Sequence, residues 1–406
     1  MSEHIMYAGA GQEAKGCPES QDCSEFQDCP KSQGCPGGRE LPLGEHWRAR
    51  ALWENVFSED SARFLDYYEA CVADHNRIFA DEVNGEIVSM LHLNPYRIWM
   101  GKEQADVSYI VAVATREEYR HQGRMGRLLR MALGECYRAK EPFAYLMPAS
   151  EKIYRPFGFR TAAYQDVLTL GSVMEDKNSR LHCVRADHEQ LLWISEFAEK
   201  MFSGACPVRA VRNLPYFERI WKEQEAVNGG ILLFMLEDVP VGYCLTGLED
   251  AAEVWEVAVD DSLPGVTCSG ALAAVTEYFK EQLPIKVSGI LPGTRMDGIN
   301  SREISWRPIT MVRIVCLEAF VKRLRFDRPI EALWNVKDDI LPGNNGCFEV
   351  KITPEGGCAR RVEKHREAVQ VTVEELAEAA FGLRGLRPEL GGSLRALRPL
   401  YLPELV

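Results

Sequence analysis

VAVATREEYRHQGRMGRLLRMAL (residues 111–133) and PASEKIYRPFGFR (residues 148–160) are the stretches that decide the fold. The first reads as an apolar strand, a turn rich in Arg and Gly, and an amphipathic helix. Arg120, Gly123 and Arg124 lie where that helix begins. A helix start offers unpaired backbone N–H groups and a partial positive charge, and arginines add to it. The stretch therefore predicts a site for a phosphate-bearing cofactor.

The spacing of this turn excludes two common phosphate-binding motifs. It is neither the GxxxxGK[ST] of a Walker loop nor the GxGxxG of a dinucleotide site. Plain helix capping and solvation of a charged surface remain the alternative explanation of the same residues.

The elements around this stretch predict one mixed α/β domain. Two helical patterns precede it, with Ser61 as a cap of the second, and Asn84-Gly85 joins two β-rich runs as a hairpin. The hairpin acids Asp81 and Glu82 either line an amine pocket or lie on a solvated strand face. After the helix, FAYLMP reads as a further strand.

A weaker copy of this order follows along the chain. LLFMLEDVPVGYCL is again a hairpin pattern, VWEVAV a strand and SGALAAVTEYFKEQL a helix. The loop between that strand and helix, DDSLPGVTCSG, has no arginine. The copy is either a related lobe without phosphate-binding residues or a chance similarity. Beyond residue 306 the pattern changes to a third, small α+β unit, whose last helix starts at a Thr372–Glu375 capping box.

The two quoted stretches together resemble the Eis (enhanced intracellular survival) family of GNAT N-acetyltransferases. The turn matches the Arg-x-x-Gly-x turn of GNAT enzymes, and PASEKIYRPFGF matches that family's Ala-Ser-Glu-x-x-Ile-Tyr-x-x-Phe-Gly segment. The resemblance implies an α+β chain of tandem GNAT-like domains followed by a domain like a sterol carrier protein. The expected divisions are a disordered tail at 1–40, a catalytic domain at 41–170, a degenerate GNAT-like domain at 171–305 and a sterol-carrier-like domain at 306–406.

The resemblance also assigns roles to individual residues. It implies that acetyl-CoA is the co-substrate, that the backbone around Val113 and Thr115 binds its pantetheine arm, and that Ser150 lies beside the thioester. It implies that Tyr154 is the general acid and that the terminal carboxylate, here of Val406, reaches the active site. The pyrophosphate turn would be lined by Arg120, His121, Gly123, Arg124 and Met125.

Ordinary pKa values limit the catalytic roles that Tyr154 and the Val406 carboxylate can have. A phenol near pKa 10 is a reasonable proton donor to a thiolate whose parent thiol is near 8.5, although Tyr154 is alternatively an aromatic packed beside Phe157 and Phe159. An α-carboxylate near pKa 3.5 is a poor base for an alkylammonium near 10.4. We therefore expect Val406 to relay a proton through water or to anchor a cationic substrate, unless it is only a docked tail.

Composition and charge narrow the remaining function classes. The net charge of −13 argues against nucleic acid as the main partner and mildly favours cationic amines. The start lacks a secretory signal and no apolar run has transmembrane length, so we expect a cytoplasmic protein without a membrane partner. Nine cysteines in the body read as small buried residues. The remaining four recur every six residues, at Cys17, Cys23, Cys29 and Cys35. This spacing is not that of a zinc site, and the polar residues around the cysteines cannot form a core. We therefore expect a disordered tail, with soft-metal or redox binding as the alternative.

The sequence thus predicts an N-acetyltransferase that transfers acetyl from acetyl-CoA directly to a primary amine, such as an aminoglycoside, a polyamine or lysine. Direct transfer is preferred because no Cys or Ser with a nearby His stands out as a nucleophile, and no metal is expected. Family resemblance implies a homo-oligomer, a hexamer. The alternatives are an acyltransferase that acts only on protein lysines and a non-catalytic lipid-carrier or regulatory scaffold.

Overall fold

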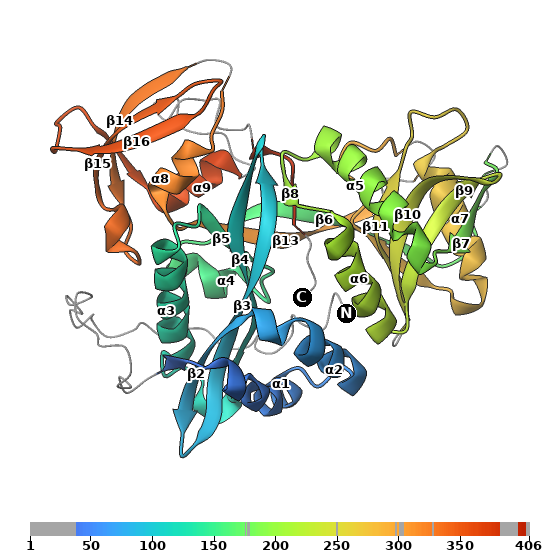
Figure 1. Ribbon diagram of the computed structural model, residues 1–406, viewed down its shortest axis with the longest axis horizontal. Coiled ribbons are helices and arrows are strands. Elements are labelled where there is room, and N and C mark those ends of the chain that lie inside the picture. The colour runs from blue at the N-terminus through green and yellow to red at the C-terminus, as the bar shows by residue number, and fades with distance from the viewer. Residues whose placement is uncertain are drawn as a thin grey trace.

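The computed structural model describes residues 38–174, 176, 179–248, 251–296, 299, 304–326, 329–381 and 397–402. Within them, one sheet of 14 strands runs through two lobes, and a separate sheet of 4 strands forms a C-terminal unit (Figure 1). The main path of the large sheet is β1-β2-β3-β4-β5-β13-β6-β12-β11-β10-β9-β7. The cysteine repeat expected to form a disordered tail lies outside the described residues. No helix among the described residues is both long and apolar enough to cross a membrane.

The first lobe is a mixed sheet with helices on both faces. Its strands are β1 (Arg39–Glu40), β2 (Arg77–Val83), β3 (Glu86–Met100), β4 (Glu103–Thr115), β5 (Phe143–Leu146) and β6 (Arg160–Leu170). Its helices are α1 (Arg50–Val56), α2 (Ala62–Cys71), α3 (Arg124–Arg138) and α4 (Glu151–Tyr154). Buried side chains of α1 and α2 pack with Tyr109 and Val111 of β4, whereas those of α3 pack with Ile110, because successive strand residues face opposite sides.

Several local predictions for this lobe are confirmed. The Ser61 side chain accepts a hydrogen bond from the backbone N–H of Phe64 at the start of α2. Asn84 and Gly85 both have positive φ, 52° and 81°, as a two-residue hairpin between β2 and β3 requires. Local sequence chemistry therefore fixes these two boundaries.

The second lobe repeats much of this arrangement. It contains β7 (Leu181–Arg185), α5 (Leu191–Ala205), β8 (Val208–Ala210), α6 (Leu214–Ala226), β9 (Gly230–Leu236), β10 (Val239–Leu248), β11 (Ala252–Val259), α7 (Cys268–Tyr278) and β12 (Ile285–Ser288). As β4 does with β5, β11 pairs with β12 in parallel over only three residues. Both β4 and β11 also contain a residue of positive φ, Ala112 at 51° and Glu256 at 53°.

The C-terminal unit begins later than expected. The boundary predicted at residue 306 falls inside β13 (Ile304–Ile314), which pairs with β5 and β6 and so belongs to the large sheet. The unit proper contains α8 (Leu317–Lys322), β14 (Ile330–Lys337), β15 (Gly346–Ile352), β16 (Gly357–Val362), β17 (Val369–Thr372) and α9 (Val373–Ala380). The Thr372–Glu375 capping box at the start of α9 is confirmed.

The last described segment returns to the two lobes. β18 (Leu400–Tyr401) pairs with β8, which in turn pairs with the end of β3. The nine body cysteines are all unpaired, and most are buried as predicted. The prediction of burial is wrong for Cys358, which lies exposed on β16, and Cys71 and Cys183 are only half-buried.

Candidate active site

The strands β4 and β5 form a parallel pair over only three residues, in the middle of β4. Their register joins Ser108–Ile110 to Ala144–Leu146, where β5 ends. β4 continues to Thr115 and keeps its pairing with β3 on the other side, where Ser89 faces Thr115. Residues 111–115 therefore have one backbone edge without a strand partner in the described part of the sheet. We call this the open edge of β4.

A β-bulge lies in the open edge. Between β3 and β4 the register shifts, so that Met90 faces Ala114 but His92 faces Val111. The extra residue is accommodated at Ala112, whose φ is 51°. Bulges re-aim backbone groups and occur often next to active sites. The two predicted backbone positions, Val113 and Thr115, follow Ala112 along β4 and are both half-buried.

The turn after β4 ends at a helix start that no side chain caps. Gly123 is the N-cap residue of α3 with φ 73°, and no side chain accepts a bond from the first turn. His121 also has a positive φ, 60°, and is exposed. The Arg120 Nε atom donates to the Thr115 carbonyl oxygen at 3.2 Å, which joins the turn to the open edge. The first N–H groups of α3 are thus left for an anion.

Two arginines of this turn share one carboxylate. Arg124 Nη1 and Arg127 Nη2 lie 2.8 and 3.1 Å from Asp81 Oδ2, and the Asp81 side chain is 3% exposed. The expectation of a solvated strand face is therefore wrong for Asp81, and the alternative of an amine-pocket residue stays a prediction. Its carboxylate holds the two guanidinium groups beside the helix start and neutralises part of their charge. Glu82 likewise pairs with arginines, Arg39 and Arg48.

The corresponding helix start in the second lobe is closed by the chain itself. The Thr267 side chain caps α7 by accepting from the Gly270 N–H at 3.0 Å. A carboxylate already lies there, because Ser269 Oγ donates to Asp176 Oδ2 at 3.0 Å. An anion approaching α7 would meet a satisfied cap and a like charge. Of the two helix starts, α3 is the one suited to phosphate.

Tyr154 lies at the end of α4, in the hydrophobic cluster that also contacts the open edge. The ring is 6% exposed and meets Phe159 edge-on, with centroids 6.1 Å apart. Val113 and Met125 are half-buried and pack against this cluster. Ser150, the N-cap residue of α4, is half-buried and its side chain caps nothing. Burial raises the pKa of Tyr154 above its ordinary value, so its hydroxyl stays protonated at neutral pH.

The two quoted stretches meet at Gly126 and Phe157. A Cβ atom on Gly126 would lie 3.0 Å from Phe157 Cζ, so glycine at this position of α3 lets the Phe157 ring approach the helix without displacement. The Phe157 carbonyl oxygen accepts from Arg313 Nε at 2.8 Å. Arg313 is fully buried and pairs with Asp338 of the C-terminal unit at 2.6 Å. The turn that follows Tyr154 is thus held by α3 on one side and by the C-terminal unit on the other.

The predicted carboxylate of Val406 lies outside the described residues. The last described residue, Leu402, accepts a bond from Thr310 Oγ1 at 3.3 Å. Thr310 precedes Met311, which pairs with Leu146 at the end of β5. The described part of the tail therefore comes within one strand of the point where β4 and β5 separate.

Sequence reasoning missed several residues of this region. The Arg313–Asp338 pair joins segments that no local pattern connects. Asp166 of β6 is another: it is buried, and burial raises its pKa to about 6. The signal available for Asp166 was weak, an acid inside an apolar strand in YQDVLTL.

Comparison with known proteins agrees with this geometry. Residues 39–162 match the family described as acetyltransferase (GNAT) domain. This segment contains the open edge of β4, the turn and Tyr154. Residues 39–162 therefore form an acetyltransferase (GNAT) domain. No curated protein sequence gives a match.

Solved structures extend the likeness to most of the chain. A probable N-acyltransferase from Enterococcus faecalis V583 superposes with TM-score 0.68 at 16% identity, over 86% of this chain and 90% of that one. A GCN5-related N-acetyltransferase from Anabaena variabilis gives 0.64 at 16% identity, with the same two coverages. Eis1 from Mycobacterium abscessus gives 0.57 at 17% identity, again over 86% and 90%. At these identities the likeness shows a shared fold.

Proposed function

We propose that the chain transfers an acetyl group from acetyl-CoA directly to a primary amine. The observation that carries the proposal is the open edge of β4 beside the uncapped start of α3, with Tyr154 packed in the same cluster. In this reaction the amine nitrogen attacks the thioester carbonyl, a C–N bond forms and the C–S bond breaks. The amine loses one proton and the departing thiolate gains one.

The proposed cofactor residues divide into backbone and side-chain groups. The open edge at Val113 and Thr115 offers backbone groups to the pantetheine arm and to the thioester oxygen. The first turn of α3, after Gly123, offers N–H groups to the pyrophosphate. The other residues proposed to line the cofactor site are Arg120, His121, Arg124, Met125 and Ser150.

Tyr154 is the proposed proton donor to the sulfur. Its raised pKa keeps the hydroxyl protonated, yet it also makes transfer to a thiolate near pKa 8.5 less favourable than an ordinary phenol would. We propose that Tyr154 first stabilises the sulfur by a hydrogen bond and completes the transfer as the attacking amine releases its own proton. The proton lost by the amine makes the overall exchange balanced.

The terminal carboxylate of Val406 is the proposed partner of the amine. Four residues beyond Leu402 can span at most about 14 Å when extended. This reach is consistent with an approach to the end of β5, next to which the Leu402 carbonyl is bound. A carboxylate there would anchor an ammonium or relay its proton through water.

Further assignments belong to the same proposal. We propose that residues 171–305 form a degenerate GNAT-like domain and that the C-terminal unit is similar to a sterol carrier protein. A homohexamer, a cytoplasmic location and membership of the Eis family are proposed on the resemblance of sequence. An acyltransferase restricted to protein lysines and a non-catalytic scaffold are the competing functions.

An acetyl-CoA melting experiment tests the cofactor site. A ligand at 100 times its Kd stabilises a folded protein by about 2.7 kcal/mol, so a clear rise in melting temperature is expected. No shift at millimolar acetyl-CoA would refute the proposed enzyme activity and favour the non-catalytic scaffold.

A panel of polyamines, aminoglycosides and lysine peptides, assayed by release of free thiol, then identifies the acceptor.

A tyrosine pair tests the proton donor. Tyr154→Phe should lower kcat by about 10²-fold or more while the Kd for acetyl-CoA changes little. Tyr278→Phe is the matched control, because Tyr278 ends α7 in the second lobe and is 42% exposed. Equal turnover in both variants would remove Tyr154 from the mechanism.

A C-terminal extension tests the role of Val406. A few residues added after Val406 should abolish turnover without altering the melting temperature.

A further inference from the structure

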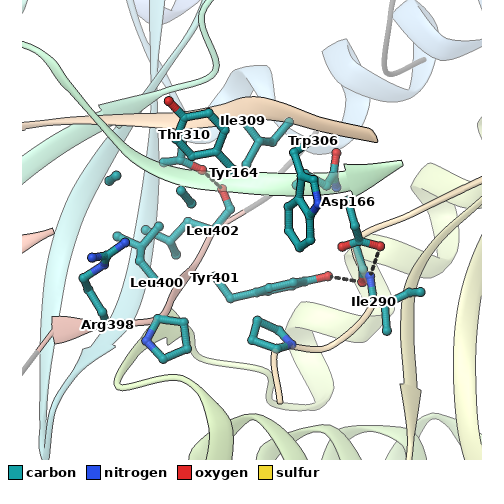
Figure 2. A pocket seen from close by; sticks show the side chains of 16 residues that line it. Tyr164, Asp166, Ile290, Trp306, Ile309, Thr310, Arg398, Leu400, Tyr401 and Leu402 are labelled. Atoms are coloured by element: carbon teal, nitrogen blue, oxygen red, sulfur yellow. Dashed lines mark hydrogen bonds between the residues drawn. The ribbon is translucent and has the colours of Figure 1, made fainter. Parts of the chain in front are cut away.

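A pocket distinct from the cofactor turn lies where β6, β13 and the C-terminal segment meet (Figure 2). Its volume is about 710 Å³, which is within the range of small-molecule sites. Four segments contribute to its walls: residues 162–166 of β6, residues 289, 290 and 292 after β12, residues 306, 309 and 310 of β13, and residues 398–402. Most of these side chains are apolar, so the few charged groups decide what the pocket selects.

Asp166 is the acidic group of this pocket. Its side chain is buried, and its carboxylate accepts a hydrogen bond from the Ile290 backbone N–H at 3.4 Å. Across the described segments of the chain, no Lys or Arg forms an ion pair with it. Burial raises the pKa of Asp166 to about 6, so the carboxyl is mostly ionised at neutral pH. A buried carboxylate without a cation is costly, and functional sites are where such groups concentrate.

Aromatic rings surround this carboxylate. Trp306 is 65% exposed although it is one of the largest apolar side chains, and Tyr164 is 41% exposed. Figure 2 shows the Trp306 indole directed toward the ring of Tyr401, with the Asp166 carboxylate beside them. The Tyr401 hydroxyl donates to the Gly289 carbonyl oxygen at 2.9 Å, which fixes that ring as a wall. Tryptophan faces attract cations more strongly than other aromatic faces do.

The cationic wall residue lies away from this corner. Arg398 also lines the pocket, and Figure 2 places it on the opposite side from Asp166. The pocket therefore has an acidic, aromatic corner and an apolar middle. This polarity fits a ligand with one positive end and an uncharged body.

We propose that this pocket binds a small monocation with an apolar body, its ammonium group between the Asp166 carboxylate and the Trp306 indole. The Asp166 carboxylate supplies charge complementarity, and the exposed Trp306 indole supplies a face for a cation–π contact. Binding requires neither acetyl-CoA nor the acetyl transfer, so it stands or falls separately from the proposed enzyme activity.

Calorimetric titration with benzyltrimethylammonium chloride tests the proposal. This quaternary cation has no N–H and cannot be acetylated, so its binding reports the pocket alone. We expect saturable binding without acetyl-CoA, and at least about tenfold weaker binding of benzyl alcohol, which keeps the ring and loses the charge. Asp166→Asn and Trp306→Leu should each weaken the cation by about tenfold or more.

Matched variants elsewhere serve as controls. Asp260→Asn removes another carboxylate of low exposure, one already paired with Lys200 at 2.8 Å, and Trp47→Leu removes an indole that is 70% exposed in the first lobe. Both should bind the cation as the unmodified protein does. Absence of saturable binding, equal binding of benzyl alcohol, or unchanged binding by Asp166→Asn and Trp306→Leu would each overturn the proposal. Because Trp306 is exposed, Trp306→Leu keeps the test available if Asp166→Asn fails to fold.

Discussion

Replacing Asp166 by Asn should make the protein more stable at neutral pH. Burial raises the pKa of this carboxyl from 3.8 to about 6 in the folded state. The protonated group stabilises the fold below pH 3.8, and this contribution is lost as the pH rises to about 6, because the unfolded chain ionises first. At about 1.4 kcal/mol per pKa unit, ionisation of Asp166 costs the folded protein about 3 kcal/mol above pH 6. Asn cannot ionise and keeps an oxygen for the Ile290 N–H.

Urea denaturation followed by circular dichroism measures this effect. By linkage, about 1 kcal/mol of the cost is present near pH 4.5 and nearly all of it at about pH 7.5. The advantage of Asp166→Asn over the unmodified protein should therefore grow by about 2 kcal/mol between these two conditions, whatever constant offset the amide introduces. Asp260→Asn is the control and should show almost no pH dependence between these two conditions, because the Lys200 hydrogen bond lowers the pKa of Asp260 below 3.8 and the group is ionised in both. A difference that stays flat with pH, or one that favours the unmodified protein as the pH rises, would refute the reasoning.

Two further predictions concern the supports of the Tyr154 turn. Gly126→Ala should lower the free energy of unfolding by about 1–3 kcal/mol, because its Cβ would press on Phe157 Cζ, whereas Gly134→Ala on the same helix should raise it by about 1 kcal/mol; equal effects in thermal melts would contradict the packing argument. Asp338→Leu should lower the free energy of unfolding more than Arg313→Met does. Asp338→Leu leaves the buried Arg313 guanidinium and three N–H donors without their acceptor, whereas in Arg313→Met the Asp338 carboxylate still accepts from those three donors. We expect about 3–5 kcal/mol for the smaller loss, and a reversed order in urea denaturation would show that the ion pair does not govern this contact.

Local chemistry made a good part of the first lobe predictable from sequence. The cap at Ser61 and the hairpin at Asn84-Gly85 depend on residues within a few positions of one another. The turn at Gly123 is of the same kind, since its positive φ is a property that glycine alone supplies without strain. Short-range rules therefore predicted the turn and the helix start at Gly123, whereas the binding of a cofactor there stays a proposal.

Long-range pairing could not be predicted in the same way. β13 inserts between β5 and β6, so a strand from beyond residue 300 completes the sheet of the first lobe. The pocket at Asp166 combines four segments that are distant in sequence. The bulge at Ala112 depends on how β4 registers against β3, which an alternating pattern does not specify. Each of these features is set by tertiary contacts.

The second lobe differs from the first at the position of the β-bulge. Its bulge residue is Glu256, where the first lobe has Ala112. The Glu256 carboxylate receives two bonds from the fully buried Arg212, at 2.8 and 3.3 Å, and one from the Tyr243 hydroxyl at 2.6 Å. The ring of Tyr401, from the C-terminal segment, lies 5.3 Å from the same guanidinium. Charged and aromatic side chains thus occupy the place where the first lobe leaves backbone groups unpaired, and removing either charged partner would leave a buried charge at a cost of about 3–5 kcal/mol. The Arg212–Glu256 ion pair also gives the C-terminal segment a docking surface, because the Arg212 guanidinium contacts the Tyr401 ring. Tyr401 belongs to β18, which pairs with β8, and β8 pairs with β3 of the first lobe.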